Sequence, residues 1–149
     1  MENLDVKISN MELSDLDSIA PYLETDFDDF WNYNVFKSEL ENGNSKYLVA
    51  KISHQIIGFA GFIPVLDEAD ISNIVVHKDF RNQKIGSLLL NALIDLACSI
   101  NINTLNLEVR QSNVSAIKLY EKYGFKVCGI RKKYYNNLEN AILMKKILN

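Results

Sequence analysis

The sequence is poor in cysteine, proline and glycine. Its 149 residues include only two cysteines, two prolines and six glycines. Cys98 and Cys128 are too few and too far apart to predict a disulfide framework or a zinc site, and we expect both to be buried thiols. With so little proline and glycine, no linker, repeat or low-complexity stretch interrupts the chain. We therefore expect a single domain over residues 1–149.

Long apolar runs and an excess of basic charge are also absent. No apolar run approaches the roughly 20 residues that cross a bilayer, and the opening MENLDVKISNMELSDLD carries acids where a signal peptide would be apolar. The net charge of −3 disfavours a general nucleic-acid binder. His54 and His77 have no second histidine at ligand spacing, so no metal site is expected. These absences predict a cytoplasmic protein without membrane or direct nucleic-acid contact.

The patterns that are present predict an α/β fold. Apolar alternation and short apolar runs predict strands at 6–9, 46–52, 56–66, 69–77, 104–109, 125–135 and 140–148. Helices are predicted after Ser14, over 27–41, over 85–100 and after Asn113, where Ser14 and Asn113 would be N-caps. Gly124 would end the last helix in the left-handed conformation. This order predicts a mixed, mostly antiparallel central sheet flanked by helices on both faces.

One turn in this order could bind an anion. The stretch FRNQKIGS (80–87) leaves a strand and opens the helix predicted over 85–100. The first N–H groups of a helix have no internal acceptor, Gly86 lets a ligand approach the backbone, and Arg81 and Lys84 add positive charge. A Walker A loop and a Rossmann glycine motif are both absent. Taken alone, the turn would more often be an ordinary helix start with solvated charges.

A second stretch, LEVRQSNVSAIKLYEKYGF (107–125), carries candidate catalytic groups. Glu108 falls near the end of a strand, and Asn113 and Tyr120 lie seven residues apart, which places them near one helix face. Taken alone, Glu108 could equally be a solvated carboxylate, and Tyr120 a packed aromatic residue.

Together, the two stretches resemble a known family. The pattern R-x-x-x-x-G after a strand, followed by N-x-x-A-x-x-L-Y-x-x-x-G-F, resembles the GNAT family of acetyl-CoA-dependent N-acetyltransferases. DEADISNIVVH, IRKKYY and AILM are further similar to the ribosomal-protein-alanine N-acetyltransferases within that family. The resemblance covers nearly the whole chain in element order and is strongest from 68 to 146.

The resemblance implies a role for each matching residue. It implies that the strand backbone at Ile74, Val75 and Val76 binds the pantetheine arm and polarises the thioester, while Asn113 binds the cofactor arm. The pyrophosphate of acetyl-CoA, the implied cosubstrate, would sit on the amides of Asn82, Gln83, Lys84, Ile85, Gly86 and Ser87. Glu108 would be the general base and Tyr120 the general acid.

The sequence departs from the family pattern Q/R-x-x-G-x-G/A at one position. Lys84 stands where the family has its first glycine. If the loop needs positive φ there, a lysine strains it, although its charge could assist phosphate binding.

The resemblance implies that the acceptor is the N-terminal peptide of a ribosomal protein and that the reaction uses no metal. Trp31, Tyr134 and Tyr135 could line the site for the first residues of this acceptor, or could simply pack.

Two alternatives differ in the acceptor or in catalysis: a GNAT enzyme acting on a small amine such as a polyamine or antibiotic, and a non-catalytic acyl-CoA-binding module. The module would need neither Glu108 nor Tyr120, so their joint presence favours an enzyme. A nucleotide-binding regulatory domain would need a parallel sheet, which the three consecutive strands from 46 to 77 do not suggest.

Overall fold

The computed structural model describes residues 5–27, 33–135 and 139–148. Within these ranges, seven strands hydrogen-bond in the order β1-β2-β3-β4-β5-β7-β6. The strands are β1 (Val6–Asn10), β2 (Lys46–Ile52), β3 (Gln55–Val65), β4 (Glu68–Val76), β5 (Thr104–Arg110), β6 (Lys126–Tyr135) and β7 (Glu139–Ile147). The helices are α1 (Leu13–Ile19), α2 (Tyr33–Glu41), α3 (Ile85–Ser99) and α4 (Val114–Lys122).

The predicted fold class is confirmed. The pairs β1–β2, β2–β3, β5–β7 and β6–β7 are antiparallel, whereas β4 and β5 pair in parallel over Glu68–Asp70 and Thr104–Asn106. The chain divides into two compact units: unit 1 comprises residues 1–63 and 72–95, and unit 2 comprises residues 64–71 and 96–149. Strands β3 and β4 each contribute residues to both units.

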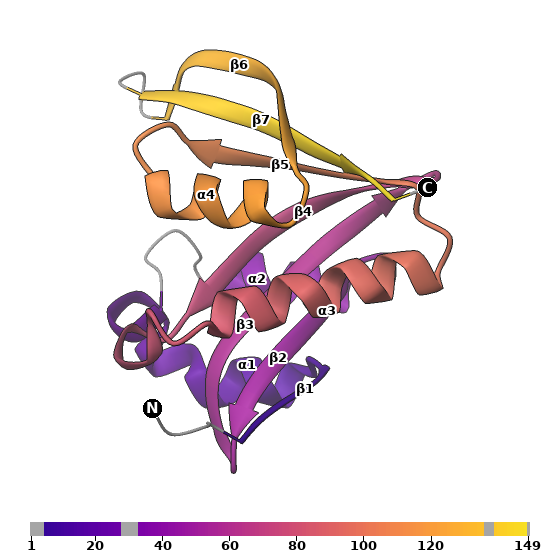
Figure 1. Ribbon diagram of the computed structural model, residues 1–149. Helices are drawn as coiled ribbons and strands as arrows, with labels where there is room; N and C mark the ends of the chain where they lie inside the picture. The colour runs from indigo at the N-terminus through magenta and orange to yellow at the C-terminus, as the bar shows by residue number, and fades with distance from the viewer. Residues whose placement is uncertain (1–4, 28–32, 136–138, 149) are drawn as a thin grey trace. The chain divides into compact units, whose positions relative to one another are not determined.

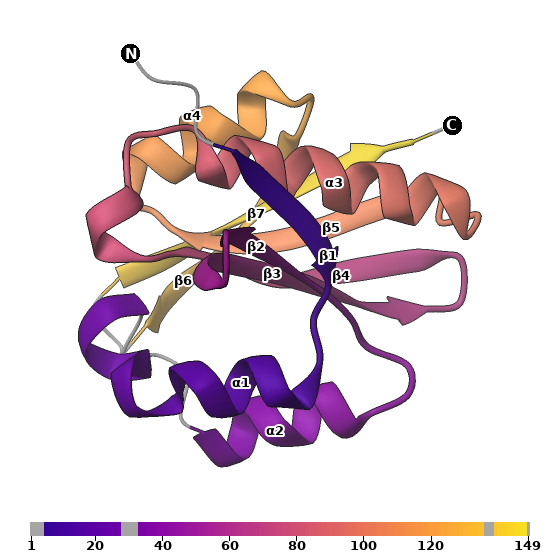
Figure 2. The ribbon, with the colours of Figure 1, turned by 90° about the horizontal axis from the view of Figure 1, so that it is seen from below.

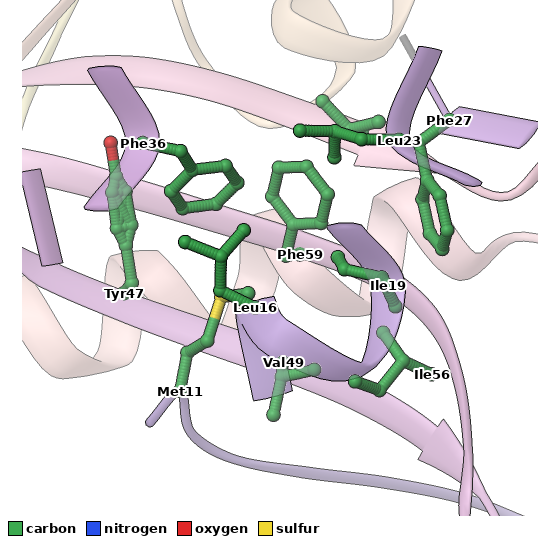
Figure 3. Packing of buried hydrophobic residues seen from close by; sticks show 11 residues of the cluster. Met11, Leu16, Ile19, Leu23, Phe27, Phe36, Tyr47, Val49, Ile56 and Phe59 are labelled. Atoms are coloured by element: carbon green, nitrogen blue, oxygen red, sulfur yellow. The ribbon is translucent and has the colours of Figure 1, made fainter. Parts of the chain in front are cut away.

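Unit 1 has helices on both faces of its strands. Figure 2 shows α1 and α2 on one side of β1–β4 and α3 on the other. Between α1, α2 and the sheet lies an apolar cluster built around Phe36 and Phe59, whose ring centroids are 4.8 Å apart (Figure 3). Its members are Met11, Leu16, Ile19, Leu23, Phe27, Phe36, Tyr47, Val49, Ile56, Phe59 and Val75. Burial of this surface is the main force that holds α1 and α2 against the sheet.

Helix α1 starts earlier than the sequence predicts. Its N-cap is Glu12, and not Ser14, because the Asp15 carboxylate accepts a hydrogen bond from the Glu12 N–H at 2.8 Å. Asp15 also forms an ion pair of 2.8 Å with Lys51 of β2, which ties the helix start to the sheet. After α1 the chain continues through a 3-10 turn, Ala20–Tyr22, and a π-helical turn, Leu23–Phe27.

Helix α3 buries only part of the apolar stripe that its spacing predicts. Ile85, Leu89, Leu93 and Ala97 are buried, and Ala92 and Leu96 are half-buried. Leu88 is 44% exposed, and Ile100, just beyond the helix, is 38% exposed. The sheet accepts the helix closely at Gly58. A Cβ there would lie 2.9 Å from the Val75 carbonyl oxygen and 3.0 Å from Leu89 Cδ1. Gly58 of β3 therefore lets α3 and the end of β4 lie close to its backbone.

Unit 2 contains β5, β6, β7 and α4, shown in orange and yellow in Figure 1. Asn113 caps α4, as predicted, since its Oδ1 accepts the Ala116 N–H at 3.2 Å. Gly124 follows α4 with φ +93°, as predicted, and the Phe125 N–H then bonds to the Tyr120 carbonyl at 3.0 Å. The prediction of buried thiols is wrong: Cys98 and Cys128 are both exposed. Cys98 is on the outer side of α3, and Cys128 is in the edge strand β6.

Candidate active site

The turn between β4 and α3 has an unusual backbone. Asn82 and Lys84 have φ values of +63° and +66°, while α3 begins at the next residue, Ile85. The positive φ at Lys84 is the condition under which the sequence predicts strain, because a side chain in this region crowds the following carbonyl. Lys84 is therefore held in a conformation that suits glycine better.

This turn has donors for an anion. The first intrahelical bond of α3 runs from the Leu88 N–H to the Lys84 carbonyl, at 3.1 Å. Helix geometry leaves the N–H groups of Ile85, Gly86 and Ser87 without an intrahelical acceptor, and the helix dipole adds partial positive charge there. The Lys84 side chain is exposed, whereas Ile85 is buried and anchors the helix start. These features fit the pyrophosphate of a nucleotide cofactor.

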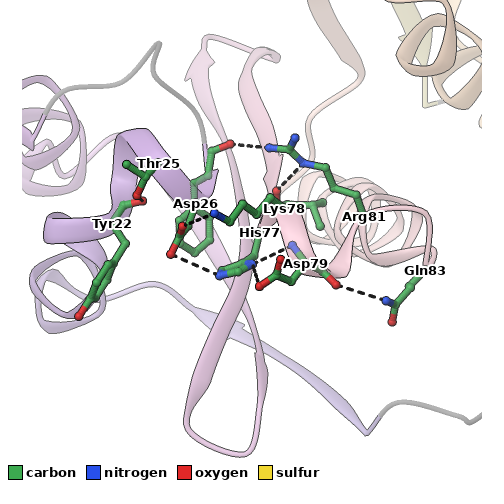
Figure 4. Close-up of polar contacts among 10 residues, drawn as sticks. Tyr22, Thr25, Asp26, His77, Lys78, Asp79, Arg81 and Gln83 are labelled. Carbon is green, nitrogen blue, oxygen red and sulfur yellow. Dashed lines mark hydrogen bonds and ion pairs between the residues drawn. The ribbon is translucent and has the colours of Figure 1, made fainter.

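Arg81, at the beginning of this turn, does not simply add charge beside the helix. Its Nη2 donates to the Phe27 carbonyl at 2.7 Å, and its Nε donates to the Val76 carbonyl at 3.1 Å (Figure 4). The Gln83 amide lies 3.5 Å from the Asp79 carbonyl. Arg81 therefore joins the end of β4 to the π-helical turn. Sequence reasoning missed this contact, because backbone carbonyls leave no mark in the residue pattern.

The three β4 residues proposed for the pantetheine arm lie just before the turn. Val75 is buried in the apolar cluster, and Ile74 and Val76 are half-buried. The strand ends at Val76, and the His77 N–H then bonds to the Ile57 carbonyl of β3 at 2.8 Å. All of these residues belong to unit 1, as does the turn.

Glu108, Asn113 and Tyr120 belong to unit 2. Glu108 lies on β5 with its side chain 31% exposed, and its Oε1 forms an ion pair of 3.3 Å with Arg131 of β6. A carboxylate paired in this way keeps lone pairs that can accept a proton from water or an amine. Arg131 is a second contact that the sequence did not reveal.

Tyr120 is buried on α4, with its ring edge-on to Phe125 at a centroid distance of 5.8 Å. The Asn113 Oδ1 is occupied by the helix cap and lies 3.3 Å from Ser115 Oγ, so its amide NH₂ is the group left for a ligand.

The end of β5 is braced by an additional carboxylate. Glu139 of β7 accepts a hydrogen bond from the Ser112 N–H at 2.7 Å and lies 3.8 Å from the Arg110 guanidinium. The hydrogen bonds from Ser112, with a smaller contribution from Arg110, lower the pKa of Glu139. This contact fixes the short connection that leads to the Asn113 cap.

The three residues proposed for the acceptor are not positioned by the structure. Trp31 lies outside the described residues. Tyr134 and Tyr135 are in β6, where Tyr135 pairs with Glu139, but their side chains lie outside the described part.

Among the described residues, no helix is long and apolar enough to span a membrane. The same part of the chain contains no group of three or more potential metal-ligating side chains.

Comparison with known proteins defines the class. Residues 8–125 match the profile of the acetyltransferase (GNAT) family, and the chain belongs to this family. It is 38% identical over 143 residues to the [ribosomal protein bS18]-alanine N-acetyltransferase of Escherichia coli, covering 92% of this chain and 94% of that protein. It is 44% identical over 111 residues to the enzyme of the same name from Haemophilus ducreyi, covering 70% and 77%.

A solved structure gives the same relationship. The crystal structure of the ribosomal-protein-S18-alanine N-acetyltransferase from Escherichia coli superimposes with a TM-score of 0.89 at 34% identity, covering 97% of this chain and 94% of that one. The protein is thus an acetyl-CoA-dependent N-acetyltransferase with the GNAT fold.

Proposed function

We propose that this enzyme acetylates the N-terminal α-amine of a protein, and that its acceptor is the N-terminal alanine of ribosomal protein S18. The observation that carries the proposal is the 38% identity, over nearly the full length of both chains, to an enzyme named for that reaction. An acceptor on the ribosome would place the reaction in the cytoplasm.

The chemistry of the proposed catalytic groups suits an α-amine. An α-amino group has a pKa of about 7.7–8.0, whereas a lysine side chain has a pKa of about 10.4. At pH 7 roughly a tenth of α-amines are neutral, against fewer than one lysine in a thousand. Because part of such an amine is already neutral, a single carboxylate is enough: Glu108, exposed and paired with Arg131, would take up the proton that the amine loses, directly or through water. Tyr120 would then donate a proton to the departing thiolate, whose ordinary pKa is near that of cysteine, about 8.5.

The turn at 82–87 would hold acetyl-CoA, which supplies the acetyl group as a thioester. The free N–H groups of Ile85, Gly86 and Ser87, with the exposed Lys84 ammonium, support pyrophosphate binding there. The backbone of Ile74–Val76 would bind the pantetheine arm, and the Asn113 amide would donate to it. Trp31, Tyr134 and Tyr135 remain proposed walls of the acceptor site.

Mass spectrometry of reactions with acetyl-CoA tests the acceptor. The panel contains peptides that begin with the S18 sequence at alanine, the same peptides beginning with serine or methionine, and free polyamines. A matched peptide with a blocked N-terminus keeps every lysine but removes the α-amine. We expect one acetyl group on the alanine peptide and none on the blocked peptide. Acetylation only of lysine side chains or of polyamines would contradict the proposal and favour a small-amine enzyme.

A further inference from the structure

Arg81 contacts two segments that are distant in sequence. Its two hydrogen bonds go to the Phe27 and Val76 carbonyls, at 2.7 and 3.1 Å, and Phe27 lies 54 residues away. Both acceptors are neutral backbone oxygens. Among the described residues, the Arg81 guanidinium forms no ion pair within 4.0 Å with a carboxylate. In this structure Arg81 therefore acts as a donor of two hydrogen bonds to neutral carbonyls and not as the partner of an ion pair.

The same two segments are joined a second time through Asp26. The Asp26 carboxylate lies 3.1 Å from Lys78 Nζ and 3.7 Å from His77 Nε2 (Figure 4). The His77 ring is buried, edge-on to Phe27 at 5.2 Å and to Phe80 at 5.6 Å, and its Nδ1 accepts the Asp79 N–H at 3.0 Å. The connection between β4 and α3 is therefore fixed against the end of the π-helical turn.

This attachment ends where the turn proposed to bind the cofactor, residues 82–87 (the cofactor turn), begins. Arg81 precedes Asn82, the first of the two residues with positive φ. A residue such as lysine keeps a positive φ only where surrounding contacts hold it, because other backbone conformations are lower in energy. A turn that leaves its binding conformation part of the time binds its ligand more weakly, in proportion to the lost population.

We propose that Arg81 is a positioning residue for the cofactor turn. By clamping the Phe27 and Val76 carbonyls, it holds residues 82–87 in the conformation that presents their N–H groups, and it does not contribute through a charge on the phosphates. This assignment rests on the proposed binding of acetyl-CoA at that turn.

Isothermal titration with coenzyme A tests the assignment on three variants. Arg81→Met keeps an unbranched aliphatic side chain and removes every donor. Arg81→Gln is neutral and keeps an NH₂ that can donate to the carbonyls. Lys7→Met removes an exposed cation from β1 and controls for the overall change in charge. We expect the Kd to rise about tenfold in Arg81→Met, to rise by less than about threefold in Arg81→Gln, and to remain unchanged in Lys7→Met.

Kinetics and salt dependence separate the explanations. A positioning role predicts a higher KM for acetyl-CoA with kcat at saturation nearly unchanged, and the same salt dependence of binding as in the wild type, because no phosphate contact is lost. Equal weakening in both Arg81 variants with a reduced salt dependence would assign Arg81 to the phosphates and overturn the proposal. A lowered Tm with unchanged Kd would reduce Arg81 to a stabilising residue and also overturn it.

Two further outcomes are decisive. If Arg81→Met does not fold, the Kd and salt dependence of Arg81→Gln decide between positioning and charge. If the wild-type enzyme does not bind coenzyme A, the proposed cofactor site itself is wrong, and this result is distinct from a failure of the Arg81 variants alone.

Discussion

Replacing Lys84 by glycine should stabilise the folded protein. At φ +66°, the Lys84 Cβ crowds the neighbouring carbonyl, which costs about 1–2 kcal/mol. Glycine removes that cost but gives the unfolded chain more freedom, which costs about 0.4–1 kcal/mol. The net gain in the free energy of unfolding is then about 1 kcal/mol. In a chain of this length, it should raise the Tm by roughly 2–4 °C.

Two matched variants make the measurement specific. Asn82 has nearly the same φ, +63°, but asparagine tolerates the left-handed region, so Asn82→Gly should give little or no gain. Lys84→Met removes the charge and keeps the Cβ, so its Tm should stay near that of the wild type. Urea unfolding and thermal scans of all four proteins measure the differences.

Binding separates strain from charge at the same residue. If the Lys84 ammonium contacts the pyrophosphate, Lys84→Met and Lys84→Gly should both bind coenzyme A more weakly, by about threefold to tenfold, with a smaller salt dependence. A fall in the Tm of Lys84→Gly would refute the argument from strain. Unchanged binding in Lys84→Met would refute the contact with phosphate.

The remaining predictions concern catalysis, packing and pH. Tyr120→Phe should leave coenzyme A binding nearly intact and lower kcat by about 10²-fold, without recovery at high pH, whereas Glu108→Gln should recover part of its loss as the amine deprotonates; full turnover in Tyr120→Phe with chemistry rate-limiting would make Tyr120 a packing residue. Gly61→Ala should destabilise the protein by about 1–3 kcal/mol, because its Cβ would overlap the Tyr47 ring, while Gly43→Ala, with nothing within 4 Å, should be nearly neutral; equal urea midpoints would contradict this. Burial raises the pKa of Tyr47 from 10.0 to about 12, so the unfolded state releases this proton first and the wild type should lose stability relative to Tyr47→Phe as the pH rises from 10 to 12. Parallel stability curves for these two proteins over that pH range would show that the hydroxyl titrates normally.

Local sequence patterns predict most of the fold. Strand and helix positions follow from alternation and 3.6-residue spacing, and the α4 cap at Asn113 and the turn at Gly124 depend only on residues within a few positions. The errors arise where an alternative of similar local energy exists. Ser14 is a good N-cap, but Asp15 accepts the Glu12 N–H and also pairs with Lys51, so tertiary contact moves the helix start by two residues.

The site was predictable only in part. The motif that predicts an anion site at residues 82–87 is local, and so is the consequence of having a lysine where the family has glycine. The contacts of Arg81 with Phe27, of Asp26 with His77, and of Glu108 with Arg131 join residues far apart in sequence. In each contact the partner is a backbone carbonyl or a titratable side chain of a common type. Nothing in the residue pattern therefore distinguishes Arg81, Asp26 or Glu108 from a solvated surface group.

The strained backbone of the turn at residues 82–87 and the hydrogen bonds of Arg81 beside it are related. Lys84, at φ +66°, stores strain that would open the turn if its ends were free. The ends are not free, because Ile85 is buried in unit 1 on one side and Arg81 holds the Phe27 and Val76 carbonyls on the other. Arg81 should therefore matter more when Lys84 is present than when glycine replaces it. In a double-mutant cycle, the loss of coenzyme A affinity caused by Arg81→Met should be smaller in the Lys84→Gly background, and losses that simply add would show that clamp and strain act independently.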